Sequence, residues 1–444
     1  MTTFCVTTLG CKVNQYESEA IITALRSAGW TLAMGVNPVD VHIINTCTVT
    51  GKASMQSRQA IRQAARRHPG SSVIVTGCYA QTAAHEIRKI PGIQAVVGTG
   101  DKHRIPAMLL SAAGLAPGGA QGAGEARKFK GFGDAGITVT GIRTRPLLKI
   151  QDGCDAFCTY CIVPYARGRR AGVSREASSA PHVPRLEAAG HHEVVLTGIH
   201  IGLYGRDLAA PLDLAALVRH LLDATGIARI RLSSIEPGEI SAALVEMAAT
   251  SGRLCPHFHM PLQSGDHGIL RRMHRPYSPK DFQALVLAIR DRMPDAAIGV
   301  DTLIGFPGES PEAFEHTRAL IEALPVTYLH VFPFSPRPGT PAADFPDPVA
   351  AGELKRRCGI MRTLGQAKKA AFFSRFPGRH LTPLIESRRD PATGLLKGVS
   401  ANYIPVLLAG PDNLQNRLVT ARIDGLQGKN AVRGTVVHPE PSAP

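Results

Sequence analysis

Three cysteines within eight residues constrain this chain more than any other feature of its sequence. They are Cys154, Cys158 and Cys161, in the segment QDGCDAFCTYC, and they directly follow the apolar run Leu147–Ile150. A zinc ribbon normally offers a second C-x2-C pair, and none follows downstream. Iron–sulfur clusters are usually held by four cysteine thiolates. The triplet therefore favours an iron–sulfur cluster with three protein ligands and one iron that is free for a substrate or cofactor.

The segments around this triplet alternate between strand length and helix length. Apolar runs are separated by helix-like stretches such as Leu212–Ala224, Ile240–Ala249 and Lys280–Arg292. Because strands that alternate with helices form parallel sheets, we expect an α/β fold with a partial (β/α)6 TIM-like barrel here. The predicted strands are Leu147–Ile150, Glu193–Thr197, Arg229–Ser233, His257–Pro261, Ala297–Ile304 and Tyr328–Phe334.

Polar and glycine residues follow several of these predicted strands. In such barrels the carboxyl-terminal rim carries the chemistry, so this clustering indicates a binding site there. For any single residue, loop capping or turn formation is the alternative explanation. The residues are Gly198 and His200, Ser233, Ser234 and Glu236, Gln263 and Ser264, Asp301, and Ser335 with Arg337.

The first part of the chain predicts a separate open parallel sheet with helices. The runs Thr3–Leu9, Val41–Asn45 and Val73–Thr76 each end at a cysteine and alternate with helix-like segments. Because the carboxyl ends of parallel strands share one edge of a sheet, the three thiols should converge. They could hold zinc or an iron–sulfur cluster, or they could be buried as small apolar side chains. These cysteines are Cys11, Cys47 and Cys78.

The other three cysteines have no comparable setting. Cys5 lies inside the first predicted strand, and Cys255 and Cys358 have no cysteine neighbours in sequence. Because unpaired cysteine is among the residue types most often buried, we interpret all three as structural.

Composition changes divide the chain into three predicted domains. Residues 113–140 are rich in glycine and alanine and lack apolar periodicity, so we expect a linker between domains 1–112 and 141–376. After residue 376, five short runs are separated by turn-forming residues, which predicts a small OB-like β-barrel over 377–440. The runs are Leu381–Glu386, Gly394–Ser400, Ile404–Ala409, Arg417–Ile423 and Ala431–Val437.

Charge and hydropathy limit the class of protein further. The 444 residues include 50 Lys and Arg against 35 Asp and Glu, a net charge of +15, which favours a polyanionic partner such as nucleic acid. We expect no membrane span and no secretory signal, because long apolar runs are lacking. A cytoplasmic location follows, where the nine cysteines would stay reduced.

Seven sequence motifs resemble those of a known family. The chain is similar to the methylthiotransferases of the radical S-adenosylmethionine superfamily, most of all to those that act on threonylcarbamoyladenosine in tRNA. The segment LTGIHIGLYGRD supports the subfamily resemblance. The seven motifs are LGCKVNQYESE, INTCTVT, VTGCYAQ, QDGCDAFCTYCIVPYARG, MPLQSG, IGFPGE and FSPRPGTPA, and they extend over most of residues 1–342.

This resemblance implies two 4Fe-4S clusters and S-adenosylmethionine as cofactors. Cys154, Cys158 and Cys161 would hold the cluster whose open iron chelates S-adenosylmethionine, and a second, auxiliary cluster would sit on Cys11, Cys47 and Cys78. The acidic GGE-type motif of many superfamily members is replaced here by Thr197-Gly198-Ile199-His200. The residues that we expect to contact S-adenosylmethionine are Tyr160, Thr197, Gly198, Ser233 and Gln263.

The implied reaction replaces a hydrogen on carbon 2 of an adenosine next to the anticodon with a methylthio group. Acid–base groups alone would not replace that hydrogen, so a radical route is required. The implied partners are a tRNA anticodon stem-loop and a flavodoxin- or ferredoxin-like one-electron donor. Residues 377–440 resemble the RNA-binding TRAM domain, with Tyr403 as a candidate stacking residue for which packing in the core is the alternative.

Three alternatives remain open at this point. Within the family, the substrate could instead be isopentenyladenosine in tRNA or an aspartate of a ribosomal protein. Outside it, the chain could be a non-catalytic iron–sulfur protein that binds RNA or senses redox state.

Overall fold

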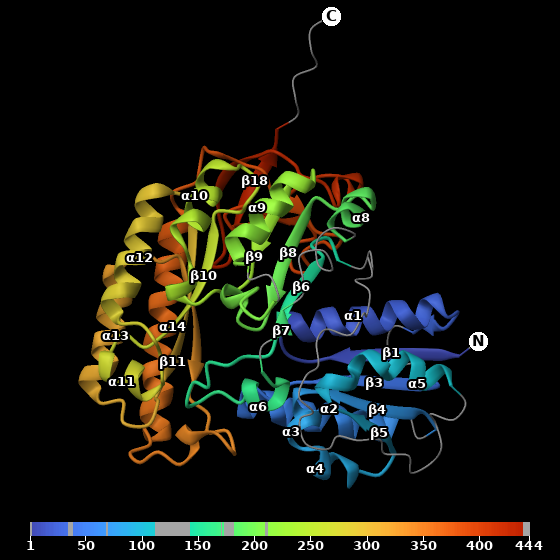
Figure 1. Ribbon diagram of the computed structural model, residues 1–444. Coiled ribbons are helices and arrows are strands. Elements are labelled where there is room, and N and C mark those ends of the chain that lie inside the picture. The colour runs from blue at the N-terminus through green and yellow to red at the C-terminus, as the bar shows by residue number, and fades with distance from the viewer. Residues whose placement is uncertain are drawn as a thin grey trace, which may run out of the picture.

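The computed structural model describes residues 2–33, 39–67, 70–111, 143–169, 171–172, 182–208 and 212–437 (Figure 1). The linker predicted over 113–140 lies outside these residues. The described chain contains two regions built on parallel sheets and a third that is a mostly antiparallel sheet, which confirms the predicted α/β class. No described helix combines the length and the apolar character needed to cross a membrane.

The N-terminal region is a five-stranded parallel sheet in the order β2-β1-β3-β4-β5. Successive residues of a strand point to opposite faces, so Ile43 and Ile44 enter two separate apolar clusters. Helices α1 and α5 contribute to one cluster, and α2, α3 and α4 contribute to the other. The elements are β1 (Thr3–Thr8), α1 (Lys12–Ser27), β2 (Thr31–Leu32), β3 (Val41–Thr46), α2 (Gly51–Arg67), β4 (Ser72–Gly77), α3 (Cys78–Thr82), α4 (Ala84–Arg88), β5 (Ile93–Val97) and α5 (Ile105–Leu110).

The central region contains the six predicted parallel strands in the predicted order. They form two hydrogen-bonded sheets rather than one, β7-β6-β8-β9 and β10-β11-β12, where the two-residue β7 is antiparallel to β6. Between the sheets, Ile230 of β9 forms a bridge with Leu254, just before β10. Within the described residues no strand pairing joins β12 to β6. The strands are β6 (Leu147–Asp152), β7 (Ala171–Gly172), β8 (Glu193–Gly198), β9 (Arg229–Leu232), β10 (His257–Gln263), β11 (Ala297–Ile304) and β12 (Tyr328–Pro333).

Helices cover the outside of these two sheets and share one large apolar core with them (Figure 1). Five of the helices begin at a side chain that accepts a hydrogen bond from a backbone N–H in the first turn, namely Asp213, Ser241, Asp266, Ser278 and Ser310. The helices are α6 (Val163–Arg167), α8 (Val183–Ala188), α9 (Leu214–Ala224), α10 (Ala242–Thr250), α11 (His267–Arg272), α12 (Pro279–Arg292), α13 (Pro311–Ala323) and α14 (Ala351–Phe373).

The C-terminal region is a six-stranded sheet in the order β13-β17-β18-β16-β15-β14. A bridge between Leu384 and Leu418 connects β14, at one end of this order, to the segment that leads into β17. The predicted run Leu381–Glu386 contains parts of two strands rather than one. The strands are β13 (His380–Leu381), β14 (Leu384–Ile385), β15 (Leu396–Val399), β16 (Pro405–Leu408), β17 (Ala421–Gln427) and β18 (Ala431–Val436).

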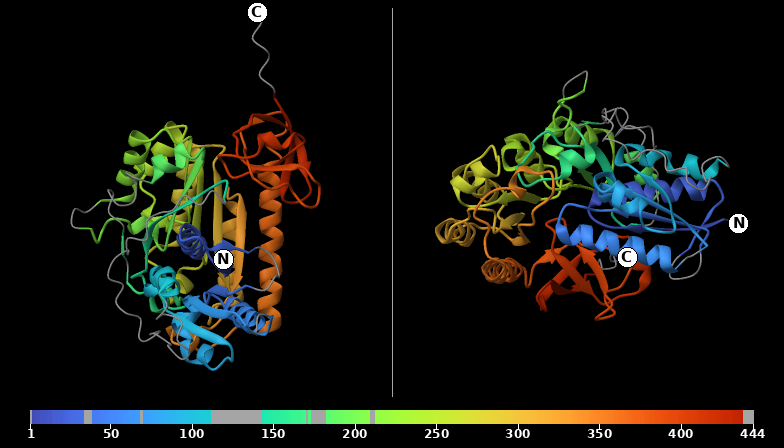
Figure 2. Two further views of the ribbon diagram at one scale, coloured as in Figure 1. Left: turned by 90° about the vertical axis from the view of Figure 1, so that its right-hand side faces the viewer. Right: turned by 90° about the horizontal axis from the view of Figure 1, so that it is seen from below.

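The two outer regions contact opposite ends of the central strands (Figure 2). At the amino ends, Arg231 of β9 donates to the carbonyl oxygens of Ser400 and Ala401 in the C-terminal region, at 3.0 and 2.9 Å. At the carboxyl ends, Ser335 accepts a hydrogen bond from the backbone N–H of Gly51, at 3.0 Å. The cysteine-bearing edge of the N-terminal sheet therefore faces the rim of the central strands.

Candidate functional site

Two glycines allow the three N-terminal cysteine loops to approach one another. Gly10 has φ +99°, and a Cβ at this position would lie 2.7 Å from both the Cβ and the Sγ atom of Cys47. Gly77 has φ +100°, and a Cβ there would overlap the backbone of Thr46. Because both backbone conformations also disfavour side chains, only glycine fits directly before Cys11 and Cys78. The structure thus brings these three thiols to one sheet edge.

Two of the N-terminal thiols, Cys47 and Cys78, are buried near cations, whereas Cys11 is exposed. Burial raises the pKa of Cys47 to about 11 and also raises the pKa of Cys78. The positive charge of Arg167 acts on both thiols in the opposite direction. A thiol must lose its proton to bind metal, so binding at this edge would release protons.

The second cysteine group lies in a loop that closes on itself after β6. Gly153 has φ +67°, and the backbone N–H of Cys154 donates to the carbonyl of Gly168 at 3.1 Å. The Sγ atom of Cys154 lies 3.3 Å from Nδ1 of His200, and Arg275 donates to Sγ of Cys158, also at 3.3 Å. N–H groups that point at cysteine sulfur stabilise the thiolate form and tune the potential of a cluster bound to it.

The spacing within both cysteine trios differs from that of a single-ion site. In a tetrahedral zinc site with Zn–S bonds of about 2.3 Å, the sulfur atoms lie about 3.8 Å apart. In the part of the chain that the structure describes, only His259, Asp301 and His330 bring three candidate ligand atoms within 4.8 Å of one another. In each trio at least one pair of sulfur atoms is therefore more than 4.8 Å apart, which is wider than one tetrahedral zinc ion requires.

A buried group of five charged side chains connects the N-terminal sheet to the central strands. We call Glu17, Lys102, Lys149, Asp152 and Arg167 the interdomain charge cluster. Arg167 donates to Glu17 at 3.0 Å and to Asp152 at 2.9 Å, and Lys149 contacts the same two carboxylates at 3.1 and 3.0 Å. Lys102 forms an ion pair with Glu17. Every member is less than a tenth exposed, so the cluster excludes water between the two regions.

The charges of this cluster hold each other in the ionised state. Burial alone would raise the pKa of Glu17, but Arg167, Lys102 and Lys149 outweigh it and hold that pKa well below its usual value. Arg167 also interacts electrostatically with Cys11 and Cys78, although it follows Cys161 by only six residues. Arg167 donates to Glu17 of α1 at 3.0 Å and directly precedes Gly168, whose carbonyl accepts from the backbone N–H of Cys154, so it links the helix that follows Cys11 to the loop that carries Cys154.

The predicted cofactor-contacting residues divide into two groups in the structure. Thr197, Gly198 and Gln263 occupy the carboxyl ends of β8 and β10, and Ser233 directly follows β9. A Cβ on Gly198 would lie 2.6 Å from the carbonyl oxygen of Gln151, so the backbone needs glycine there. Tyr160 packs beside an apolar cluster that contains Met273 and Phe306.

Several residues of this site were not found by sequence reasoning. Arg275 contacts Cys158, and Glu239 lies 2.6 Å from His200. Both residues are far along the chain from Cys154 and Cys158. Arg167 and Lys149 were also missed. A signal for Lys149 does exist, because a lysine within the buried strand LLKIQD needs a carboxylate partner.

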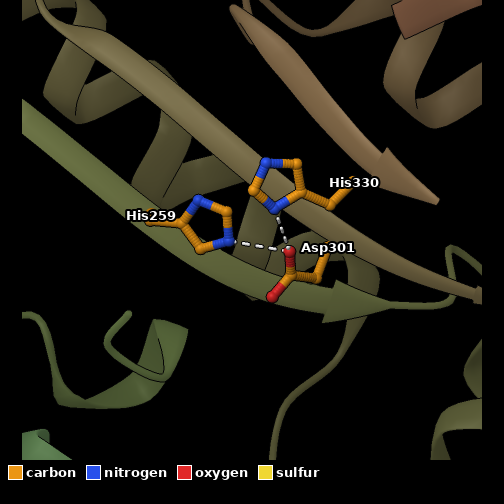
Figure 3. A group of neighbouring side chains, drawn as sticks. All are labelled: His259, Asp301 and His330. Carbon is orange, nitrogen blue, oxygen red and sulfur yellow. Dashed lines mark hydrogen bonds and ion pairs between the residues drawn. The ribbon is translucent and has the colours of Figure 1, made fainter. Parts of the chain in front are cut away.

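His259, Asp301 and His330 form a polar group on three neighbouring strands, β10, β11 and β12 (Figure 3). His259 Nε2 and His330 Nδ1 lie 2.7 and 3.2 Å from the same oxygen of Asp301. Burial would raise the pKa of Asp301, but these hydrogen bonds outweigh it and lower the pKa to about 2. Two imidazoles and a carboxylate are a common metal-binding set, yet here they are hydrogen-bonded to one another.

Two family models match separate parts of this chain. Residues 3–98 match the family described as Uncharacterized protein family UPF0004, and residues 148–321 match the Radical SAM superfamily. Among solved structures, the radical S-adenosylmethionine methyltransferase TsrM from Kitasatospora setae superimposes with a TM-score of 0.56 and 17% sequence identity. The superposition covers 77% of each chain and shows a shared fold. The class is therefore that of radical S-adenosylmethionine proteins.

Curated relatives narrow the class to a family. The chain is 35% identical to the threonylcarbamoyladenosine tRNA methylthiotransferase MtaB of Bacillus subtilis, over 95% of this chain and 94% of that protein. It is 32% identical to the tRNA-2-methylthio-N(6)-dimethylallyladenosine synthase of Pelotomaculum thermopropionicum, over 94% of each. This chain belongs to the radical S-adenosylmethionine methylthiotransferase family.

Proposed function

We propose that this protein adds a methylthio group to carbon 2 of N6-threonylcarbamoyladenosine at position 37 of tRNA, next to the anticodon. The observation that carries the proposal is that the interdomain charge cluster joins α1, which follows Cys11, to β6, which leads into the Cys154 loop. Relatives named as enzymes of this activity, such as that of Bacillus subtilis, support the choice of substrate.

The cofactors in this proposal are two 4Fe-4S clusters and S-adenosylmethionine. One cluster is held by Cys154, Cys158 and Cys161, and the auxiliary cluster is held by Cys11, Cys47 and Cys78. The convergence of the three N-terminal cysteine loops, which Gly10 and Gly77 allow, supports this assignment. When bound, they supply the one-electron chemistry that replacement of an unactivated C–H bond requires.

The protein's own residues orient these groups and control their charge. Arg275 donates to the sulfur of Cys158, and Glu239 holds His200 against Cys154. The interdomain charge cluster fixes the N-terminal sheet over the rim of the central strands. In the proposal, Thr197, Gly198, Ser233 and Gln263 line the cofactor at that rim, with Tyr160 positioned by its apolar contacts.

The RNA would be bound across the three proposed domains, 1–112, 141–376 and 377–440. The net charge of +15 and the resemblance of the last domain to TRAM modules support this role. Tyr403 is a poor candidate for base stacking, because its ring stacks on His257 with centroids 4.1 Å apart and contacts Arg231. A flavodoxin- or ferredoxin-like protein in the cytoplasm would donate the electrons.

A second candidate substrate is N6-isopentenyladenosine in tRNA. The synthase of Pelotomaculum thermopropionicum, whose name gives a dimethylallyladenosine product, is 32% identical to this chain and supports that alternative. The two candidates differ only in the substituent on N6 of the same base.

The experiment is anaerobic turnover of the reconstituted protein with dithionite, S-adenosylmethionine and tRNA that carries either modification, followed by mass spectrometry of the nucleosides. We expect a methylthio product from the threonylcarbamoyl tRNA only. A methylthio product from the isopentenyl tRNA only would show that isopentenyladenosine is the substrate. Release of no deoxyadenosine at all would indicate a non-catalytic iron–sulfur protein.

Cysteine variants test the assignment of the two clusters. Cys11→Ala and Cys154→Ala should each lose about half of the bound iron, because each removes one of the four-iron groups. Cys154→Ala should also abolish deoxyadenosine release, whereas Cys11→Ala should retain it without forming the methylthio product. Cys358→Ala, in the buried face of α14, is the matched control and should retain all of the iron.

A further inference from the structure

A cavity of about 340 Å³ lies where the N-terminal, central and C-terminal regions meet. Helix α1 contributes Lys12 and Gln15, and the C-terminal region contributes Ser387, Arg388 and Tyr403. The segment that leads into β6, together with β8 and β9, forms the remaining wall. The cavity is thus assembled only when all three regions are docked.

The cations of this cavity fall into two groups. Arg145 is paired with Glu386 at 2.9 Å, Arg231 is paired with Glu193 at 2.6 Å, and Arg143 pairs with Glu19. Lys12 and Arg388, by contrast, have no side-chain hydrogen bond or ion pair within the described ranges, and both are exposed. Two unneutralised cations from different regions therefore line one small cavity, which favours an anionic ligand.

Two neutral polar side chains accompany these cations. The amide of Gln15 and the hydroxyl of Ser387 have no side-chain hydrogen bond to any described residue. A ligand that fills the cavity should therefore carry a negative charge together with further polar groups. A purely hydrocarbon group would remove water from these side chains without replacing its hydrogen bonds, which is costly.

We propose that this cavity binds the carboxylate of the N6-threonylcarbamoyl group through Lys12 and Arg388. This inference rests on the proposed function and explains its choice of substrate. The threonyl hydroxyl and the urea-like linkage match the free groups of Gln15 and Ser387, whereas the isopentenyl group offers no polar atom.

The place of the cavity also suits the reaction. Lys12 directly follows Cys11, a proposed ligand of the auxiliary cluster. In adenine, carbon 2 and the carbon that bears N6 are the two neighbours of ring nitrogen 1. A carboxylate anchored at Lys12 would therefore bring the edge of the base that carries carbon 2 toward the cysteine edge of the N-terminal sheet.

The test measures binding of anticodon stem-loop RNAs to the reconstituted full-length protein under anaerobic conditions, by fluorescence anisotropy. Four RNAs differ only at position 37: unmodified adenosine, isopentenyladenosine, threonylcarbamoyladenosine and the methyl ester of the last. We expect the free carboxylate to bind about tenfold more tightly than its ester, which corresponds to about 1.4 kcal/mol.

Arg388→Gln should abolish this preference without changing the affinity for the unmodified RNA. Arg433→Gln, an exposed arginine of β18 outside the cavity, is the matched control and should keep the tenfold ratio. Lys12→Gln is a second variant, with iron content measured alongside because of its position next to Cys11.

The other outcomes separate this inference from the proposed function. If Arg388→Gln lowers the affinity for all four RNAs by the same factor, the cavity binds a backbone phosphate and the inference is wrong. If both variants keep the preference for the carboxylate, the inference fails while the proposed substrate stands. Tightest binding of the isopentenyl RNA by the unaltered protein would refute both.

Discussion

Replacing Glu17 with glutamine tests whether the interdomain charge cluster holds the N-terminal sheet in place. Glu17 is 9% exposed and contacts Arg167 and Lys149 at 3.0 and 3.1 Å, and it also pairs with Lys102. After the substitution, Asp152 would pair with Lys149 and Arg167, and Lys102 would lose its carboxylate partner. Removal of one partner from a buried ion pair costs about 3–5 kcal/mol. Because the amide oxygen still accepts a hydrogen bond, we expect about 3 kcal/mol.

Hydrogen–deuterium exchange of α1 and β6, which meet at this interface, measures that loss directly. A cost of about 3 kcal/mol corresponds to exchange roughly 10²-fold faster when local opening limits it. Glu315→Gln is the matched control, because Glu315 pairs only with Arg318 on the exposed surface of α13 and should leave α1 and β6 unchanged. Exchange in Glu17→Gln within about threefold of the unaltered protein would refute a role of the cluster in docking.

The same carboxylate gives the interface a defined response to acid. Since the folded pKa of Glu17 lies below its ordinary value, its stabilisation is present above about pH 4.3, the ordinary glutamate pKa. The stabilisation is lost as the pH falls through the lower, folded value. Protection of α1 should therefore stay constant from pH 8 to pH 5, apart from the intrinsic pH dependence of exchange.

Three further substitutions have defined outcomes. Gly10→Ala should lose about half of the iron because its Cβ would overlap a cysteine ligand, whereas Gly29→Ala should keep the iron. Gly29 also has positive φ, but its surroundings are open, so the alanine variant there would add only about 1 kcal/mol of backbone strain. Tyr403→Ala should speed hydrogen–deuterium exchange at the start of β10 about tenfold, because the stacked pair of Tyr403 and His257 is lost. Tyr403→Phe keeps the ring and should not change the exchange rate. Arg275→Met should make the potential of the first cluster more negative in a redox titration, because a cation and a hydrogen bond to Cys158 are removed; an unchanged potential would contradict this.

Most of the strands could be predicted because burial imposes a local pattern. The six central runs and the three N-terminal runs are short and mainly apolar, and they lie within about two residues of the observed bounds. The strands β2 and β7 were missed because each has only two residues, and their pairing depends on neighbours rather than on their own sequence. The separation of the central strands into two sheets likewise has no local signal.

The cysteines of the candidate site could be predicted from their place after strands, but their surroundings could not. Glu17 and Arg167 are separated by 150 residues, and Cys158 and Arg275 by 117. Contacts over such separations are fixed by how the regions dock, and docking leaves no periodic pattern in the sequence. Tyr403 shows the same limit, because only the docked structure covers its ring.

The two cysteine trios differ in how their members are distributed along the chain. Cys154, Cys158 and Cys161 occupy one short loop, so an emerging or unfolded chain already presents these thiols together. Cys11, Cys47 and Cys78 meet only after β1, β3 and β4 have paired and Gly10 and Gly77 have brought their loops into contact. Iron loading should therefore be ordered in time, and delivery to the N-terminal edge must wait until that sheet has folded.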